Sequence, residues 1–148
     1  MSLDFELMRR LVEDLNVGIC VLDRNDNIVV FNRKAGEQLQ QDNKSRIGSS
    51  ILRCHPERAE QGVMKMIGDL KSGELDKYEG WVHFIGKYFY EYIYPLQDDS
   101  GGHFATVIEL HDAAERAEYL KMTEDWKPPP EHGRGESSPR IPFPKRIK

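Results

Sequence analysis

Two neighbouring residues near the middle of the chain carry the most reactive side chains. His55 has an imidazole that is a good iron ligand when neutral, and Cys54 has a thiol that could ligate a metal or sense oxidants. The simpler alternatives are that His55 and Pro56 begin a helix and that Cys54 is a buried, inert thiol. Met64 and Met66 follow about two to three helical turns later, and could add a soft second ligand only if a cofactor lay along that helix.

The pair Cys54–His55 makes a poor catalytic centre. Adjacent side chains rarely point at one shared atom, and a nucleophile and its base usually come from separate segments, with a third group orienting the base. The sequence has no oxyanion-loop signature and no CxxC…CxxC, HExxH, GxGxxG or GxxxxGK[ST] string. We therefore expect no catalytic residue, no metal centre and no enzyme activity.

A second candidate is a carboxyl group inside an aromatic strand, residues 88–94. Because side chains alternate along a strand, Glu91 shares a face with Phe89 and Ile93. If that face lines a cavity, Glu91 could bind a polar ligand or a proton. The alternative is a solvated outer face. Tyr92 points the other way unless a bulge breaks the alternation.

The opposite face of that strand presents a stripe of tyrosines, with Trp81 on the preceding strand. Large apolar rings with polar tips suit protein interfaces. Burial of this face under the chain's own terminal helix is an equal alternative. The stripe consists of Tyr88, Tyr90, Tyr92 and Tyr94.

The first half of the chain predicts a helix, a hairpin and a second helix. Apolar residues recur with helical spacing over 4–15, and two β-branched runs, 17–23 and 28–31, flank an Asn- and Asp-rich turn. Asn32 is then an N-cap for a helix over 33–40.

The second half predicts one long helix, three strands and a last helix. The helix covers 56–71, the strands 78–85, 87–96 and 103–111, and the last helix 112–122, with Asp112 as its cap. Two groups of strands separated by helices predict an α+β fold around an antiparallel sheet. The apolar face of the long helix consists of Val63, Met66, Ile67 and Leu70.

The N-terminal helix over 4–15, together with the outer face of the sheet, predicts a homodimer interface. Its apolar stripe is too long for an isolated helix to leave exposed to water, and contiguous apolar patches usually mark interfaces. The stripe consists of Phe5, Met8, Leu11, Val12 and Leu15.

Composition divides the 148 residues into an acidic body and a basic, proline-rich end. The net charge is −4, and residues 125–148 carry +3, so 1–124 carry −7. An acidic body is a poor binder of nucleic acid. No apolar run is long enough to span a membrane, and 2 cysteines predict reduced thiols in the cytoplasm. We expect a flanking helix over 1–16, a domain over 17–122 and a disordered tail over 123–148.

The ordered series of motifs resembles the PAS sensor family over about residues 8–120. LVEDLNVGICVLDRNDNIVVFNRKAGEQL (11–39) is similar to the PAS opening, IGSSILRCHPERAEQ (47–61) to the segment that leads into its long helix, and YFYEYIYPLQDDSGGHFATVIELHDAAER (88–116) to its closing hairpin and exit. The Cys54-His55-Pro56 segment also resembles a PAS subgroup found with hemerythrin-like domains.

The resemblance implies a five-stranded antiparallel sheet with a ligand or cofactor site between the sheet and the helix 56–71. His55, Met66, Glu91 and Tyr92 are then the expected ligand-binding residues, and His55 is the candidate haem ligand. A flavin adduct is not expected, because neither cysteine lies in an Asn-Cys-Arg-Phe-Leu-like context.

The implied function is that of a cytoplasmic sensory and regulatory module, with roles in signal transduction and regulation of transcription. No kinase, cyclase or DNA-binding segment follows, so the output goes to another protein or the chain is a fragment. The alternative is a ligand-free PAS dimerisation or interaction module with a filled core.

Overall fold

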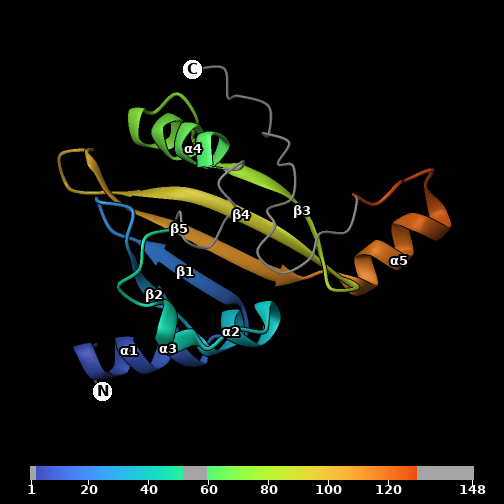
Figure 1. The fold of residues 1–148 in the computed structure, drawn as a ribbon, viewed down its shortest axis with the longest axis horizontal. Coiled ribbons are helices and arrows are strands. Elements are labelled where there is room, and N and C mark those ends of the chain that lie inside the picture. Colours follow the sequence, from blue (N-terminus) through green and yellow to red (C-terminus); the bar gives the residue numbers. More distant parts are fainter. Residues whose placement is uncertain (1–2, 52–59, 130–148) are drawn as a thin grey trace.

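A five-stranded antiparallel sheet organises the part of the chain that the structure describes. The computed structural model describes residues 3–51 and 60–129 (Figure 1). The strands stand in the order β2-β1-β5-β4-β3, so the first hairpin joins the later three strands through the pairing of β1 with β5. The strands are β1 (Gly18–Leu22), β2 (Ile28–Phe31), β3 (Tyr78–Phe84), β4 (Lys87–Gln97) and β5 (His103–Asp112). The predicted α+β fold with an antiparallel sheet is confirmed.

The N-terminal elements form as their sequence predicts. α1 (Phe5–Asp14) begins at Asp4, whose carboxylate accepts a hydrogen bond from the Leu7 amide. In the β1–β2 turn Asp26 adopts a left-handed backbone with φ +64°, which Asp tolerates better than most residues. α2 (Arg33–Leu39) follows directly, and its predicted cap Asn32 accepts a hydrogen bond from the Ala35 amide. A short helix that the sequence pattern did not predict, α3 (Asn43–Arg46), comes next.

The predicted apolar face of the long helix packs on the inner face of the sheet. α4 (Glu60–Ser72) contributes its four apolar residues to a cluster with β1, β2 and one end of β3 and β4. Residues 52–59, and with them the expected start of this helix at Pro56, lie outside the described residues. A second, smaller cluster at the other end of β3 and β4 consists of Val82, Phe84, Phe89 and Leu110.

The last helix begins later than expected and has a different cap. α5 covers Ala114–Thr123, and its N-cap Ala113 makes no side-chain cap hydrogen bond. Asp112 instead ends β5, with a carboxylate oxygen 3.3 Å from the ammonium nitrogen of Lys34. In Figure 1 α1, α2 and α3 lie beside β1 and β2, whereas α5 extends from one end of the sheet. Among 3–51 and 60–129, no helix is both long and apolar enough to cross a bilayer.

Candidate functional site

Glu91 faces the core and not the solvent. It lies on the inner face of β4 between Phe89 and Ile93, and only 8% of it is exposed. In register it stands opposite Gly80 of β3 and Leu110 of β5. Glu91 therefore does not lie on a solvated outer face, and its role in binding a ligand stays a prediction.

A second polar group, Gln38 on the buried face of α2, lies in the same row. Its Nε2 donates to the Leu110 carbonyl at 2.9 Å, and a Cβ added to Gly18 would lie 2.0 Å from its Oε1. The amide thus occupies the space that a larger residue at position 18 would fill. Oε1 is buried and receives no hydrogen bond from the described residues. Sequence reasoning missed Gln38, although a polar residue three positions after the buried Ala35 was a signal.

Glu91 and Gln38 mark a polar strip on the inner face of the sheet, on either side of Leu110. Gly18 pairs with Leu110 and Leu110 with Glu91, so the three stand in one row across β1, β5 and β4. Leu110 belongs to the smaller cluster around Phe89, so Glu91 and Gln38 place their polar groups beside that cluster. Polar groups that converge in an apolar setting are typical of small-molecule sites.

The remaining predicted ligand-binding residues do not gather at this strip. Met66 is 9% exposed and packs in the α4 cluster, whereas Met64 is 42% exposed and so does not share that buried face. Tyr92 lies on the outer face, because the register of β4 is regular there and shifts only between Leu96 and Gln97. The structure therefore does not bring Tyr92 together with Glu91.

The proposed haem ligand His55 and its neighbour Cys54 lie outside the described residues. Within the described part of the chain no group of three or more His, Cys, Asp or Glu side chains could hold a metal ion. Cys20, the cysteine in that part, is buried in the core cluster.

On the outer face, two carboxylates organise the tyrosine stripe. The Tyr90 hydroxyl donates to Glu79 at 3.3 Å, and Glu79 also pairs with Lys77. The Tyr94 hydroxyl donates to Glu109. Burial, followed by the effect of the neighbouring carboxylate, raises the pKa of Tyr90 and of Tyr94 to about 12.

The residues after α5 cover one end of this face. The Trp126 ring lies 4.8 Å from that of Trp81 and 6.3 Å from that of Tyr88. The Pro129 carbonyl lies 3.0 Å from Nδ1 of His83. A disordered tail was expected over 123–148. Within it, Trp126 and Pro129 contact the sheet, and residues 130–148 lie outside the described residues.

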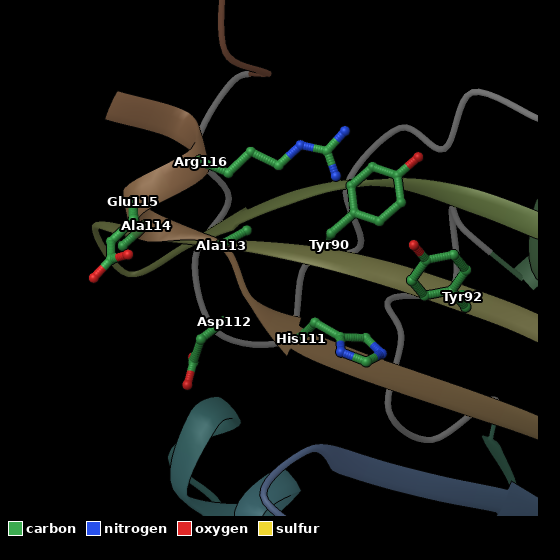
Figure 2. A pocket seen from close by; sticks show the side chains of 8 residues that line it. All are labelled: Tyr90, Tyr92, His111, Asp112, Ala113, Ala114, Glu115 and Arg116. Atoms are coloured by element: carbon green, nitrogen blue, oxygen red, sulfur yellow. The ribbon is translucent and has the colours of Figure 1, made fainter. Parts of the chain in front are cut away.

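Beside Trp126 the outer face is open and forms a pocket of about 630 Å³ (Figure 2). The rings of Tyr90, Tyr92 and His111 form its floor, with Tyr92 5.2 Å from Tyr90 and 5.3 Å from His111 between ring centroids. Arg116 reaches over from α5, its guanidinium carbon 5.4 Å from the Tyr90 ring. Figure 2 shows Glu115 pointing away from these rings. Sequence reasoning missed His111 and Arg116, because their convergence depends on where α5 leaves the sheet.

Comparison with models of known protein families identifies the family to which the chain belongs. A family model described as the PAS domain matches residues 8–112. The chain belongs to the PAS domain family. PAS domains are sensory modules of signal transduction and are generally not catalytic. The membership confirms the resemblance seen in the sequence, while the relation to the hemerythrin-associated subgroup stays a prediction.

Solved structures agree with this PAS domain in fold. A C-terminal domain from Streptococcus mutans is 22% identical, with a TM-score of 0.68, and the match covers 79% of this chain and 90% of that one. The PAS domain of BvgS from Bordetella pertussis is 20% identical, with a TM-score of 0.60 and coverages of 79% and 91%. A PAS domain from Colwellia psychrerythraea is 14% identical, with a TM-score of 0.57 and coverages of 75% and 98%. A search among curated protein sequences found no match.

Proposed function

We propose that this PAS domain is a cytoplasmic sensory module that binds a small polar ligand on the inner face of the sheet, where α2 and α4 cover it, and signals through protein contacts. The observation that carries the proposal is the buried Oε1 of Gln38, which lies beside Gly18 and receives no hydrogen bond from the described residues. Leaving a buried acceptor unsatisfied costs about 1–3 kcal/mol, and a donor group on a ligand would remove that cost.

The strip also indicates the class of ligand. Gln38 offers a carbonyl oxygen and Glu91 a carboxyl group, and Leu110 separates them in the register. Adjacent strands lie about 5 Å apart, so Glu91 stands two strands, or about 10 Å, from Gly18. A molecule that carries hydrogen-bond donors, such as an amine or an amide, fits two acceptors at that separation. The surrounding Phe89 and Ile93 would contact its apolar part.

Native mass spectrometry of protein purified from its own host tests the proposal. We expect a bound small molecule on the wild-type domain. The molecule should be lost in Gln38→Leu, which keeps the volume and removes the acceptor, and weakened in Glu91→Gln. Tyr94→Phe alters only the outer face and is the matched control, which should retain the ligand. A wild-type domain without ligand, or a Gln38→Leu variant that still carries it, contradicts the proposal.

The output is proposed to run through a homodimer and a downstream protein. None of the residues of α1 is buried, and Phe5, Met8 and Leu11 are 78%, 48% and 55% exposed. An apolar stripe of this kind on a helix surface needs a partner. The acidic body gives no support to nucleic acid as that partner.

A ligand-free interaction module is the second candidate. It is favoured by the close packing of α4, whose Val63, Ile67 and Leu70 are 6%, 2% and 2% exposed in one continuous cluster. Under this alternative the core is filled by side chains, native mass spectrometry shows the bare chain, and dimerisation persists in Gln38→Leu.

A further inference from the structure

The pocket on the outer face is separate from the proposed ligand site. The two sites lie on opposite faces of β4. Glu91 points to the inner face, and Tyr90 and Tyr92 point to the outer face. At about 630 Å³ it lies within the range of roughly 300–1,000 Å³ that is usual for binding pockets. Its floor of aromatic rings, with a guanidinium beside them, favours a flat or ring-containing occupant.

The described part of the chain ends on the same face of the sheet as this pocket. After α5 it turns back over the outer face, where Trp126 packs on Trp81 and the Pro129 carbonyl approaches His83. His83 pairs with Tyr88, and Tyr90 lies two residues further along β4. Two residues of a strand span about 7 Å, so Pro129, the last described residue, lies within reach of the pocket for a short tether.

The sequence that follows has the composition such a pocket accepts. Residues 139–144 read Pro-Arg-Ile-Pro-Phe-Pro. Proline-rich segments dock in grooves lined by aromatic rings, because their polyproline II conformation is preformed and little entropy is lost on binding. Residues 125–148 carry a net charge of +3 and residues 1–124 a charge of −7, so long-range electrostatics also favour the contact.

We propose that residues 139–144 of this chain dock in the outer-face pocket over Tyr90, Tyr92 and His111. A tether through residues 130–138 spans up to about 30 Å when extended, which is ample for the distance from Pro129. Such a tether also gives an effective concentration in the millimolar range. The chain's own segment therefore outcompetes a similar segment of another protein unless that protein binds far more tightly.

The experiment compares the full chain with a chain that ends after Pro129. A synthetic peptide of residues 138–148 is titrated into each protein, and amide chemical shifts of Tyr90, Tyr92 and His111 are followed by NMR. In the shortened chain we expect saturable shifts at these residues. In the full chain the peptide should bind at least tenfold more weakly, because the tethered copy already occupies the pocket.

Substitutions on each side of the contact complete the test. The Phe143→Ala peptide and a Tyr92→Ala shortened chain should each lose binding. Phe104→Ala, at an aromatic residue that is 55% exposed and lies outside the pocket, should keep binding.

Absence of binding to the shortened chain overturns the proposal. Equal binding to both chains also overturns it and assigns the pocket to a segment of another protein. Light scattering that shows association of the full chain but not the shortened one would instead assign the segment to a second copy.

Discussion

The side-chain amide of Asn32 donates a hydrogen bond of 2.9 Å to the main-chain carbonyl of Val12, and so ties the start of α2 to α1. The same amide donates to the Val17 carbonyl at 3.0 Å, and its Oδ1 accepts from the amides of Ile19 and Ala35. With only 1% of Asn32 exposed, water cannot replace these bonds.

Replacing Asn32 with alanine should therefore destabilise the domain strongly. Loss of a helix cap and of partners for several main-chain groups should lower the free energy of unfolding by roughly 2–4 kcal/mol. Urea denaturation followed by circular dichroism measures the change. The exposed Asn25 is the control, and Asn25→Ala should change it by less than about 1 kcal/mol. Similar losses for the two variants would contradict this account of Asn32.

Tyr90 and Tyr94 should ionise late in an alkaline titration. The pKa of Tyr90 and Tyr94 is about 12 in the folded domain, against about 10 in an unfolded chain. The folded state thus holds these protons longer, so their contribution to stability is complete below pH 10 and declines as the pH rises from about 10 to 12. Ultraviolet absorbance of the phenolate should show the late step. Its persistence in a Tyr90→Phe, Tyr94→Phe variant would contradict the assignment.

Disrupting the α1 stripe should abolish the proposed dimer. Light scattering at tens of micromolar should give a dimer for the wild type and a monomer for Phe5→Ser, Leu11→Ser. Met122→Ser changes an equally exposed apolar residue on α5, 83% exposed, and should leave the dimer intact. A wild-type monomer at this concentration would refute the interface.

Replacing Met66 with tryptophan should separate the sensor from the filled interaction module. Met66 lies in a packed cluster, so the larger ring should cost about 1–3 kcal/mol if no space adjoins it, and little if a cavity does. Thermal unfolding and native mass spectrometry are measured together. A strongly destabilised variant, with no ligand on the wild type, would rule out the sensor and leave the interaction module.

Deleting residues 127–148 should leave the domain folded. The deletion keeps Trp126, which covers Trp81, and removes a segment whose prolines cannot join a central strand. The melting temperature should fall by no more than a few degrees. Deleting residues 124–148 instead should cost more, because it uncovers the Trp81 ring. A large fall from the shorter deletion alone would show that the segment packs more firmly than a loosely docked peptide.

Sequence periodicity predicted the sheet well because each strand and helix is locally consistent. The β1–β2 hairpin, the Asn32 cap and the apolar face of α4 all follow from neighbours in the chain. Sequence periodicity predicted the sites less well, because a site depends on which helices and strands come together in the folded chain. Alternation placed Glu91 and Tyr92 on opposite faces but could not say which face is buried. Gln38 gained significance only because Gly18 and Leu110, far apart in the sequence, lie beneath it.

The pairing of β1 with β5 brings the start and the end of the sheet unit next to each other. Gly18, near the entry of the chain, stands directly opposite Leu110, near its exit. Paired strands are about 5 Å apart, so the two ends of the sheet unit are neighbours. A domain whose ends meet can be spliced into a host protein as an insert, with little disturbance to either. The β1–β5 pair thus places the segment that follows α1 and the segment that leads into α5 on neighbouring strands.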